Sequence, residues 1–501
     1  MAGINEARTQ AENAVIRPLT FTLRAGGTCT ISMVAQGSAP EVSLEYSMDN
    51  GVSWTPFIVG ETEIILNTDS ETASLRASRP NACISVGESD GNRFVLTGDA
   101  SSYPPDGVDV SGNINALLNA DLPIDALPRG CFSNLFNYCS PIFDADDLEL
   151  PATMLAPGCY SGLFDSCGYL SRPPRELPAT TLAEWCYSHM FMGCVGLVMP
   201  PKLPATTLAK HCYSSMFLGC AGLVDAPELP ATTLAEGCYS HMFASASFYN
   251  KLPVLPATTL APDCYLGMFA GNSLTKAPEL PATTLAERCY TSMFSGCMYL
   301  EEAPVLPATT LVPWCYDNMF GDCVSLKRLV VGFRDWNAGI GTENWLKGVP
   351  AGVPGIGEFH SCCILSQVFG PSYIPTGWTP VLDFCDYAFT PGTQEHAACL
   401  LDCTCCDPAL KTACDAAGGT FDAENCTCSC GCEDENDKVT ACILSGGIWS
   451  HRLCSCLCEE PTHQSGCICT CCDEGDLKTR CEAIGGRFNS QKCQCWGYPV
   501  V

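Results

Sequence analysis

The stretch that decides the fold is LPATTLAEWCYSHMFMGC at residues 177–194, which returns as LPATTLAKHCYSSMFLGC at residues 203–220. A repeat of this length is typical of a solenoid, because one unit is too short to bury its own apolar face and must stack on its neighbours. The sequence therefore predicts an elongated body with a continuous core. The leucines that open the units follow one another at steps of 25 to 27 residues: Leu150, Leu177, Leu203, Leu229, Leu255, Leu280 and Leu306.

The spacing within a unit predicts its local structure. Leu208, Cys212, Met216 and Phe217 have helical spacing, which predicts one or two helical turns with an apolar face. The second part of the unit runs into a proline, which cannot donate to a sheet, so we expect strands of only about three residues there. We expect these strands to point the following leucines inward: Leu197, Leu223, Leu274, Leu300 and Leu326.

Two columns of cysteines run through the repeats. The first is complete, whereas Ala246 and Asn272 replace the second in two consecutive units, so pairing within a unit would strand Cys238 and Cys264. Strands about 4.8 Å apart leave bridges between neighbouring units geometrically possible in the second column. We expect buried thiols in both columns, packed as small apolar groups. The columns are Cys131, Cys159, Cys186, Cys212, Cys238, Cys264, Cys289 and Cys315, and Cys139, Cys167, Cys194, Cys220, Cys297 and Cys323.

Residues before the repeats alternate apolar and polar side chains, with turn residues between them. Residues 18–34 and 41–59 show this pattern, which predicts a small antiparallel β-sandwich ending near Asp99. Residues 47–54, SMDNGVSW, match the Asp-box pattern S-x-D-x-G-x-[ST]-W. A single copy indicates a structural hairpin, in which Asp and Ser side chains close the turn and Trp54 fills the core.

The repeats resemble BspA-type leucine-rich repeats, which are common in surface proteins of Bacteroidetes. The resemblance spans roughly residues 91–378 and lies in the CYxxMFxGCxxLxxAPxLPATTLA units, in GNINALL at residue 112, and in two closing segments. These segments, WNAGIGTENWLKGV from Trp336 and IPTGWTP from Ile374, are similar to the ends of such arrays. The segment PLTFTLRAGG with SMDNGVSW is similar to the domain that often precedes them. The resemblance implies a surface protein that binds partners.

The composition changes sharply beyond Trp378. Between Cys399 and Cys495 lie 20 cysteines, and nine of them form three units that share one frame. With few large apolar residues, these units need cross-links or metal. We expect disulfides, because C-x-C spacing is not the usual zinc pattern; metal binding and free thiols are the alternatives. The disulfide candidates are Cys414, Cys426, Cys428, Cys442, Cys454, Cys456, Cys481, Cys493 and Cys495.

The predicted fold class is therefore multidomain. Residues 1–100 are predicted to form the antiparallel β-sandwich, and residues 101–380 a leucine-rich-repeat-like solenoid with short strands, helical turns and flanking caps. Residues 381–501 are predicted to form a cysteine-rich tail of three units.

Charge and motifs exclude several functions. The 54 acidic and 25 basic side chains give a formal charge of −29, which argues against a nucleic-acid partner. No stretch approaches the roughly 18 apolar residues of a membrane span. The seven histidines fit no nucleophile, metal or acid/base motif. We therefore expect no enzyme, no cofactor and no metal site.

The residue before the first cysteine varies between units, so a partner could be recognised there. Exposed aromatic and charged side chains on a solenoid suit glycan or protein contacts, and tolerated surface drift is the alternative. The candidate binding residues are Trp185, His211, Arg288 and Trp314.

The 39 cysteines are typical of an extracellular protein, but residues 1–19 contain no signal-like apolar segment. We therefore expect a non-enzymatic display and attachment protein on the surface or tail of a phage virion, which contacts a host-cell surface glycan or protein and other virion proteins. The alternative is a BspA-type bacterial cell-surface or extracellular adhesin, and the third possibility is an accessory protein of a glycan-active enzyme.

Overall fold

The computed structural model describes residues 16–382 apart from 25–26, 88, 99–106, 122–123, 248–250, 338–339 and 362–364. The chain forms two compact units, Met1–His396 and Ala397–Val501, and each is described by itself. In the second unit the structure describes only short strands: β14 (Thr420–Asp422), β15 (Thr427–Ser429), β16 (Gly447–Ser450), β17 (Ser455–Cys458), β18 (Ile468–Cys469), β19 (Arg487–Asn489) and β20 (Gln494–Trp496).

The first unit begins with two small β-sheets. One has the order β10-β8-β1-β6-β3-β4, with β9 also paired to β8, and the other has the order β5-β2-β7. Their buried faces meet where the rings of Phe21 and Phe94 lie 5.2 Å apart. The strands are β1 (Leu19–Leu23), β2 (Cys29–Gln36), β3 (Leu44–Ser47), β4 (Thr55–Phe57), β5 (Ile64–Leu66), β6 (Thr72–Ala77), β7 (Gly91–Gly98), β8 (Val108–Asn113), β9 (Ile142–Asp144) and β10 (Leu148–Glu149).

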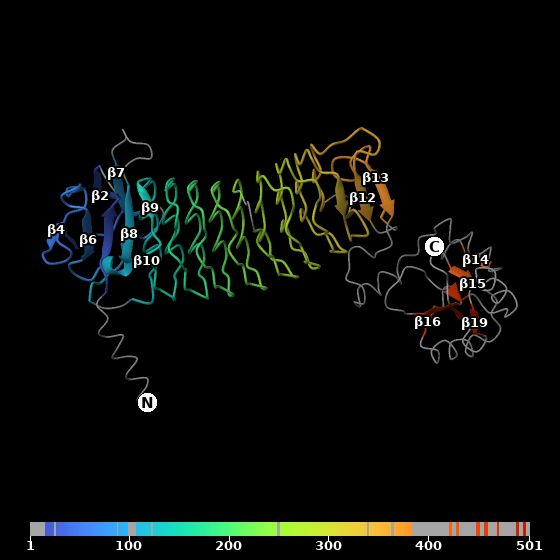
Figure 1. Ribbon diagram of the computed structural model, residues 1–501, viewed down its shortest axis with the longest axis horizontal. Coiled ribbons are helices and arrows are strands. Elements are labelled where there is room, and N and C mark those ends of the chain that lie inside the picture. The colour runs from blue at the N-terminus through green and yellow to red at the C-terminus, as the bar shows by residue number, and fades with distance from the viewer. Residues whose placement is uncertain are drawn as a thin grey trace, which may run out of the picture. The chain divides into compact units, whose positions relative to one another are not determined.

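Strand β8 joins this sheet to the repeats. It pairs antiparallel with β1 on one side and parallel with β9 and β10 on the other. The 3-10 helix η1 (Ile114–Leu117) follows it. The N-terminal sheet thus continues past residue 100 and covers the first repeat (Figure 1). The three predicted domain ranges stay predictions.

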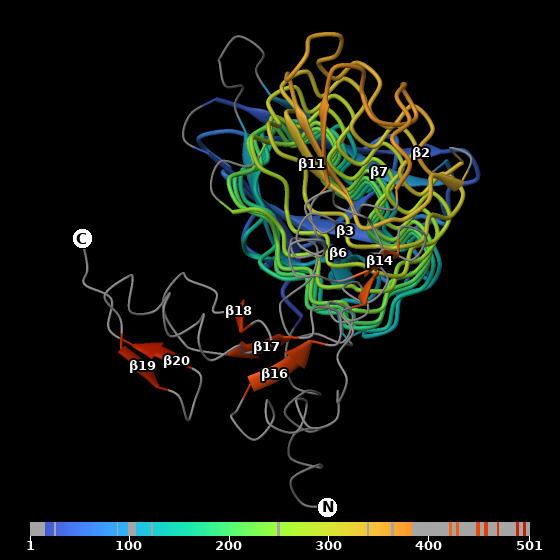
Figure 2. The same ribbon diagram turned by 90° about the vertical axis from the view of Figure 1, so that its right-hand side faces the viewer.

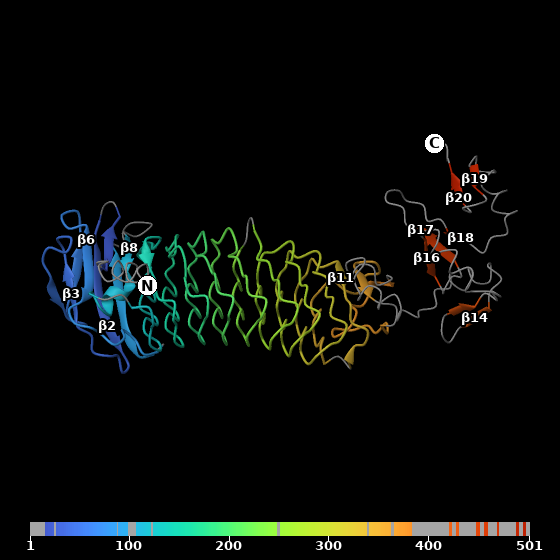
Figure 3. The same cartoon turned by 90° about the horizontal axis from the view of Figure 1, so that it is seen from below.

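The repeats stack as rungs behind β8. In the end-on view the successive coils superimpose, and the side views show them in a single file (Figures 2 and 3). A single apolar core runs from Leu19 to Trp378. The leucines predicted to point inward are buried: Leu197, Leu223, Leu274, Leu300 and Leu326.

The predicted helical turns are wrong. Cys212, Met216 and Phe217 are buried as expected, but the segment is a run of turns. Alternate N–H groups bond within the rung, as Met216 does to the Tyr213 carbonyl at 3.2 Å. The groups between them bond to the next rung, as Phe217 does to the Met242 carbonyl at 2.9 Å. An α-helix would instead place every bond within the segment.

Positive φ angles explain why a helix cannot form. Every fourth residue is left-handed: His211 has a φ of 53°, Ser215 of 54° and Gly219 of 76°. Such residues interrupt a right-handed helix. The strands of the repeats are also shorter than predicted, since most reduce to single-residue parallel bridges such as that between Glu176 and Lys202.

The repeats end on a three-stranded parallel sheet, β11-β12-β13. Its strands are β11 (Arg328–Val330), β12 (Glu358–Ser361) and β13 (Thr379–Leu382). Trp336, Trp345 and Trp378 are buried here, and each indole N–H donates to a backbone carbonyl at 2.7–3.0 Å. Trp345 tilts against Tyr316 of the last repeat, with ring centroids 6.3 Å apart. These tryptophans thus cover the end of the core.

Candidate binding face of the repeats

The candidate residues all lie on one column, which we call the slot column: Gly158, Trp185, His211, Gly237, Asp263, Arg288 and Trp314. Each has a φ between 53° and 67°. Their N–H groups donate to the following rung, as His211 does to the Glu236 carbonyl at 2.9 Å. This bond fixes the backbone of each slot, while the neighbouring cysteine turns inward. The column therefore presents one residue per rung, and two of these residues are glycines.

Trp185 and His211 are brought together by the stacking of their rungs. Their ring centroids lie 4.1 Å apart with the planes inclined by 25°. The His211 ring lies over Gly237, where an added Cβ atom would meet it at 2.2 Å. Trp185 remains 38% exposed. The pair thus forms an aromatic step on the surface, supported by a glycine.

Arg288 pairs with Asp263 of the preceding rung. Its Nε and Nη2 atoms donate to the two carboxylate oxygens, each at 2.8 Å. This bidentate bond raises the pKa of Arg288 and fixes the guanidinium orientation. Sequence reasoning named Arg288 without Asp263, because the pairing depends on which rungs are adjacent.

Trp314 stands at the far end of the column and is 41% exposed. It lies five rungs from Trp185, which is about 24 Å at the usual strand spacing. The four predicted residues therefore share a column and do not converge on one pocket. Such a column suits an extended partner.

A second left-handed column carries His189 and His241. Ser188 Oγ lies 2.7 Å from Nδ1 of His189, which is the contact of a hydrolytic dyad. Ser188 is fully buried, however, and bonds also to the Ser214 carbonyl at 3.2 Å. Burial lowers the pKa of His241. Because the hydroxyl cannot reach a substrate, this pair positions the histidine and does not act as a nucleophile.

Both cysteine columns consist of buried, free thiols, as the buried-thiol interpretation predicted. Burial raises the pKa of Cys159 and Cys212 to about 12. The thiolate is the reactive form of cysteine, so these side chains are unreactive at neutral pH.

The second column has a role that sequence reasoning missed. From Cys167 onwards, the thiol of each member donates to the carbonyl of a phenylalanine in the preceding rung, as Cys194 does to Phe164 at 3.1 Å, and Cys139 donates to the Phe94 carbonyl of β7. Where Asn272 replaces cysteine, its amide donates to the equivalent Phe243 carbonyl at 3.3 Å. Asparagine in a cysteine column was the one signal in the sequence for a donor function.

Two ladders of stacked aromatic rings were also missed. One runs from Phe132 through a tyrosine in each unit to Tyr316, with centroids 5.7–5.9 Å apart. The other runs from Phe136 to Phe320 at 5.2–5.8 Å. The Cys-Tyr-x-x-Met-Phe spacing, repeated at the rung step, was the available signal.

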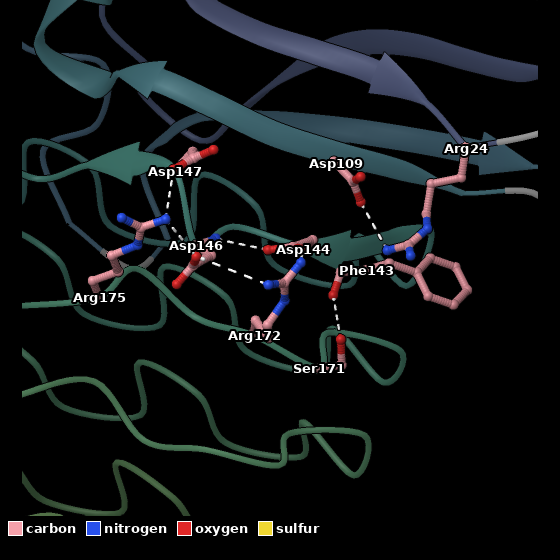
Figure 4. A network of polar contacts seen from close by, with 9 residues as sticks. All are labelled: Arg24, Asp109, Phe143, Asp144, Asp146, Asp147, Ser171, Arg172 and Arg175. Carbon is pink, nitrogen blue, oxygen red and sulfur yellow. Dashed lines mark hydrogen bonds and ion pairs between the residues drawn. The ribbon is translucent and has the colours of Figure 1, made fainter.

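Clustered charges at the junction of sheet and repeats are paired with one another (Figure 4). Arg172 bonds to Asp144, and Arg175 bonds to Asp146 at 2.8 Å and to Asp147 at 2.9 Å. Within the described ranges, no group of three or more His, Cys, Asp or Glu side chains is placed to hold a metal ion. The network therefore links rungs.

Two further predictions concern the cysteines of the tail and membrane-spanning segments. The nine disulfide candidates of the tail lie outside the residues whose side chains the structure describes. Among the described helices, none has the length and apolarity needed to cross a membrane.

No protein-family model matches the chain, and no curated protein matches it. A solved structure that is similar is a leucine-rich repeat protein from Bacteroides ovatus ATCC 8483, at 15% sequence identity and a TM-score of 0.24. The similarity covers 53% of this chain and 78% of that one. The described part of the chain is a repeat protein with stacked rungs, regularly spaced buried cysteines and two ring ladders.

Proposed function

We propose that this is a non-enzymatic display and attachment protein whose slot column contacts a glycan or protein on a host-cell surface. One observation carries the proposal: the slot residues differ from rung to rung and three of them, Trp185, Arg288 and Trp314, are exposed, whereas the neighbouring cysteine and tyrosine are buried in each of these units. Variation at a fixed, exposed position provides recognition without cost to the core.

The chemistry of the repeats supports a binding role. Their thiols are buried and held in the neutral form, and the serine hydroxyls beside His189 and His241 are buried. Exposed tryptophan and paired arginine are instead the side chains that dominate binding energy at protein interfaces. Attachment is therefore the function that fits these side chains best.

The setting that we propose is the surface or tail of a phage virion, with contacts to other virion proteins; the BspA-type cell-surface adhesin is the alternative. Mass spectrometry of purified virions distinguishes them. Detection of the chain at stoichiometric level supports the first setting, and detection only in the cell-envelope fraction supports the second.

The binding role is tested with the double variant Trp185→Ala/Trp314→Ala. Binding of the labelled full chain to a panel of Bacteroidetes cells should weaken about tenfold or more, which is about 1.4 kcal/mol. Met199→Ala is the matched control, because Met199 is 59% exposed in the same unit but outside the slot column. Unchanged binding by the double variant would remove the slot column from the proposed interface.

A further inference from the structure

The slot column contains one open position, next to Trp185. One face of the Trp185 ring stacks on His211 of the following rung. The opposite face turns towards the preceding rung, where residue 158 is glycine. A Cβ atom built on Gly158 has no atom within 4 Å, whereas one built on Gly237 meets the His211 ring at 2.2 Å. The space at Gly237 is filled by a ring, and the space at Gly158 is open.

The open position has the dimensions of one more ring in the stack. In the slot column, the ring centroids of Trp185 and His211 on adjacent rungs lie 4.1 Å apart. A ligand ring at the same distance on the other face of Trp185 would occupy the place that a ring-bearing side chain at residue 158 would take. Such a ligand extends the aromatic step by one member without moving the protein.

The surroundings define the chemistry of that ring. Glu184 is exposed beside Trp185, whereas the ion pair of Lys210 with Glu236 lies on the side of that ring covered by His211. One charged hydrogen-bonding side chain thus borders the apolar plane. A pyranose ring matches this arrangement, because its C–H groups form an apolar face and its hydroxyls surround the edge.

Other ring and cation ligands fit less well. A nucleotide would bring phosphate towards a chain with a formal charge of −29. A quaternary ammonium ion is usually enclosed by several aromatic side chains, whereas the position beside Gly158 offers it a single ring face, that of Trp185. We propose that Trp185 and the gap at Gly158 form a subsite for a neutral pyranose ring of a host glycan, an inference that rests on the proposed attachment function.

Two variants of the full chain test the subsite from opposite sides. Trp185→Ala removes the plane, and Gly158→His fills the gap while leaving Trp185 in place. Histidine is compatible with the left-handed backbone there, since His211 has a φ of 53° in the equivalent slot and Gly158 has a φ of 67°. Thermal unfolding confirms that both variants fold, and Met199→Ala serves as the control.

The probes are the tetrasaccharides of β-1,4-linked glucose, β-1,4-linked N-acetylglucosamine and α-1,6-linked mannose, with affinity measured by calorimetry and saturation-transfer NMR. The wild-type chain should bind at least one of them saturably. Both variants should weaken that binding about tenfold or more, and the control should stay within about twofold. Tetramethylammonium at the same concentrations should not compete.

Three results would overturn the subsite: no saturable binding of any probe, unchanged binding by folded Gly158→His, or competition by tetramethylammonium. Cell attachment separates this inference from the proposed function. If both variants lose cell attachment and no sugar probe binds, the proposed attachment function stands, but its ligand is a protein and not a glycan. Sugar binding that depends on Trp185 while attachment persists in both variants would support the subsite and overturn its part in attachment.

Discussion

A single hydrogen bond explains why cysteine recurs in the second column. Each thiol donates to a phenylalanine carbonyl at 3.1–3.3 Å, in β7 for Cys139 and in the preceding rung for the others. Asn272 preserves the donor with its amide, whereas Ala246 has none. The column therefore selects for a small side chain that both fills the core and donates.

This role predicts opposite effects for two substitutions. Cys194→Ala removes a donor and leaves a small cavity, so the free energy of unfolding should fall by about 1–3 kcal/mol. Ala246→Cys supplies a donor where the chain lacks one and should raise it by about 0.5–1.5 kcal/mol. Urea denaturation under reducing conditions measures both. No gain from Ala246→Cys would show that the column serves packing alone.

Asp49 holds the Asp-box hairpin together, as a structural interpretation of SMDNGVSW predicts. Its carboxylate accepts bonds from the Ser53 hydroxyl at 2.5 Å and the Ser53 N–H at 2.9 Å. Trp54 does not fill the core as expected: it is half-buried, and the Arg76 guanidinium carbon lies 3.9 Å from its ring centroid. The hairpin is thus fixed from its polar side.

The hydrogen bonds from Ser53 and Ser47 lower the pKa of Asp49 from 3.8 to about 2. Because the folded pKa lies below the unfolded one, the stabilisation is present above about pH 4 and is lost as the pH falls to about 2. The stability difference between wild type and Asp49→Asn should therefore shrink across that interval, while Val52→Ala, at an 84% exposed position, shows no such trend. A difference that is constant from pH 5 to pH 2 would contradict the assignment.

At the scale of the element, each rung depends on left-handed residues at four-residue intervals. Glycine occupies many of them, but Trp185, His211 and Arg288 adopt the same conformation with φ of 53–58°. The cost of a side chain there is about 1–2 kcal/mol per residue. It is offset by the bonds that each rung makes to the next.

Two glycines of the slot column should therefore respond differently to alanine. Gly158→Ala places its methyl group in open space, so the free energy of unfolding should fall only by the backbone contribution of about 1–2 kcal/mol. The Gly237→Ala methyl group also meets the His211 ring at 2.2 Å, so the free energy of unfolding should fall further. The double variant Gly237→Ala/His211→Gly lacks the ring, so it should not show the additional fall in the free energy of unfolding. Equal losses for the two single variants, measured by thermal unfolding, would show that His211 does not occupy the space above Gly237.

At the scale of the molecule, the repeats form a core in which each rung contacts only its neighbours. The two ring ladders, the bridges and the ion pairs such as Lys210 with Glu236 all join adjacent rungs. The ends differ from the middle, with β8 at one end and the Trp345 cluster at the other. Stability should then be close to a sum over units and their interfaces.

Removal of one whole unit tests this additivity. Deletion of residues 203–228, which joins Lys202 to Leu229 and keeps the frame, should leave a folded chain with a cooperative transition. Deletion of residues 203–215, half a unit, removes Tyr213 from its ring ladder, leaves Phe217 in an incomplete rung and should abolish the transition. Near-ultraviolet circular dichroism during heating measures the outcome. Loss of cooperative folding in the whole-unit deletion would show that the rungs are not interchangeable.

The sequence by itself determined the solenoid, the inward leucines such as Leu197 and the buried thiols. Each of these follows from an apolar position that returns once per repeat, and a unit of about 26 residues has no other way to bury it. The sequence also placed Trp185, His211, Arg288 and Trp314 outside the packed positions, because their slot changes from unit to unit.

Only the tertiary structure decided the path of the backbone and the partners of the slot residues. A run of four-residue turns and a 3.6-residue helix place Cys212 and Met216 on one face alike, so their spacing cannot separate the two. The choice is made by hydrogen bonds from Phe217 and its neighbours to the next rung. The contacts of Trp185 with His211 and of Arg288 with Asp263 exist for the same reason: they join residues one rung apart, which become neighbours only when the rungs stack in register.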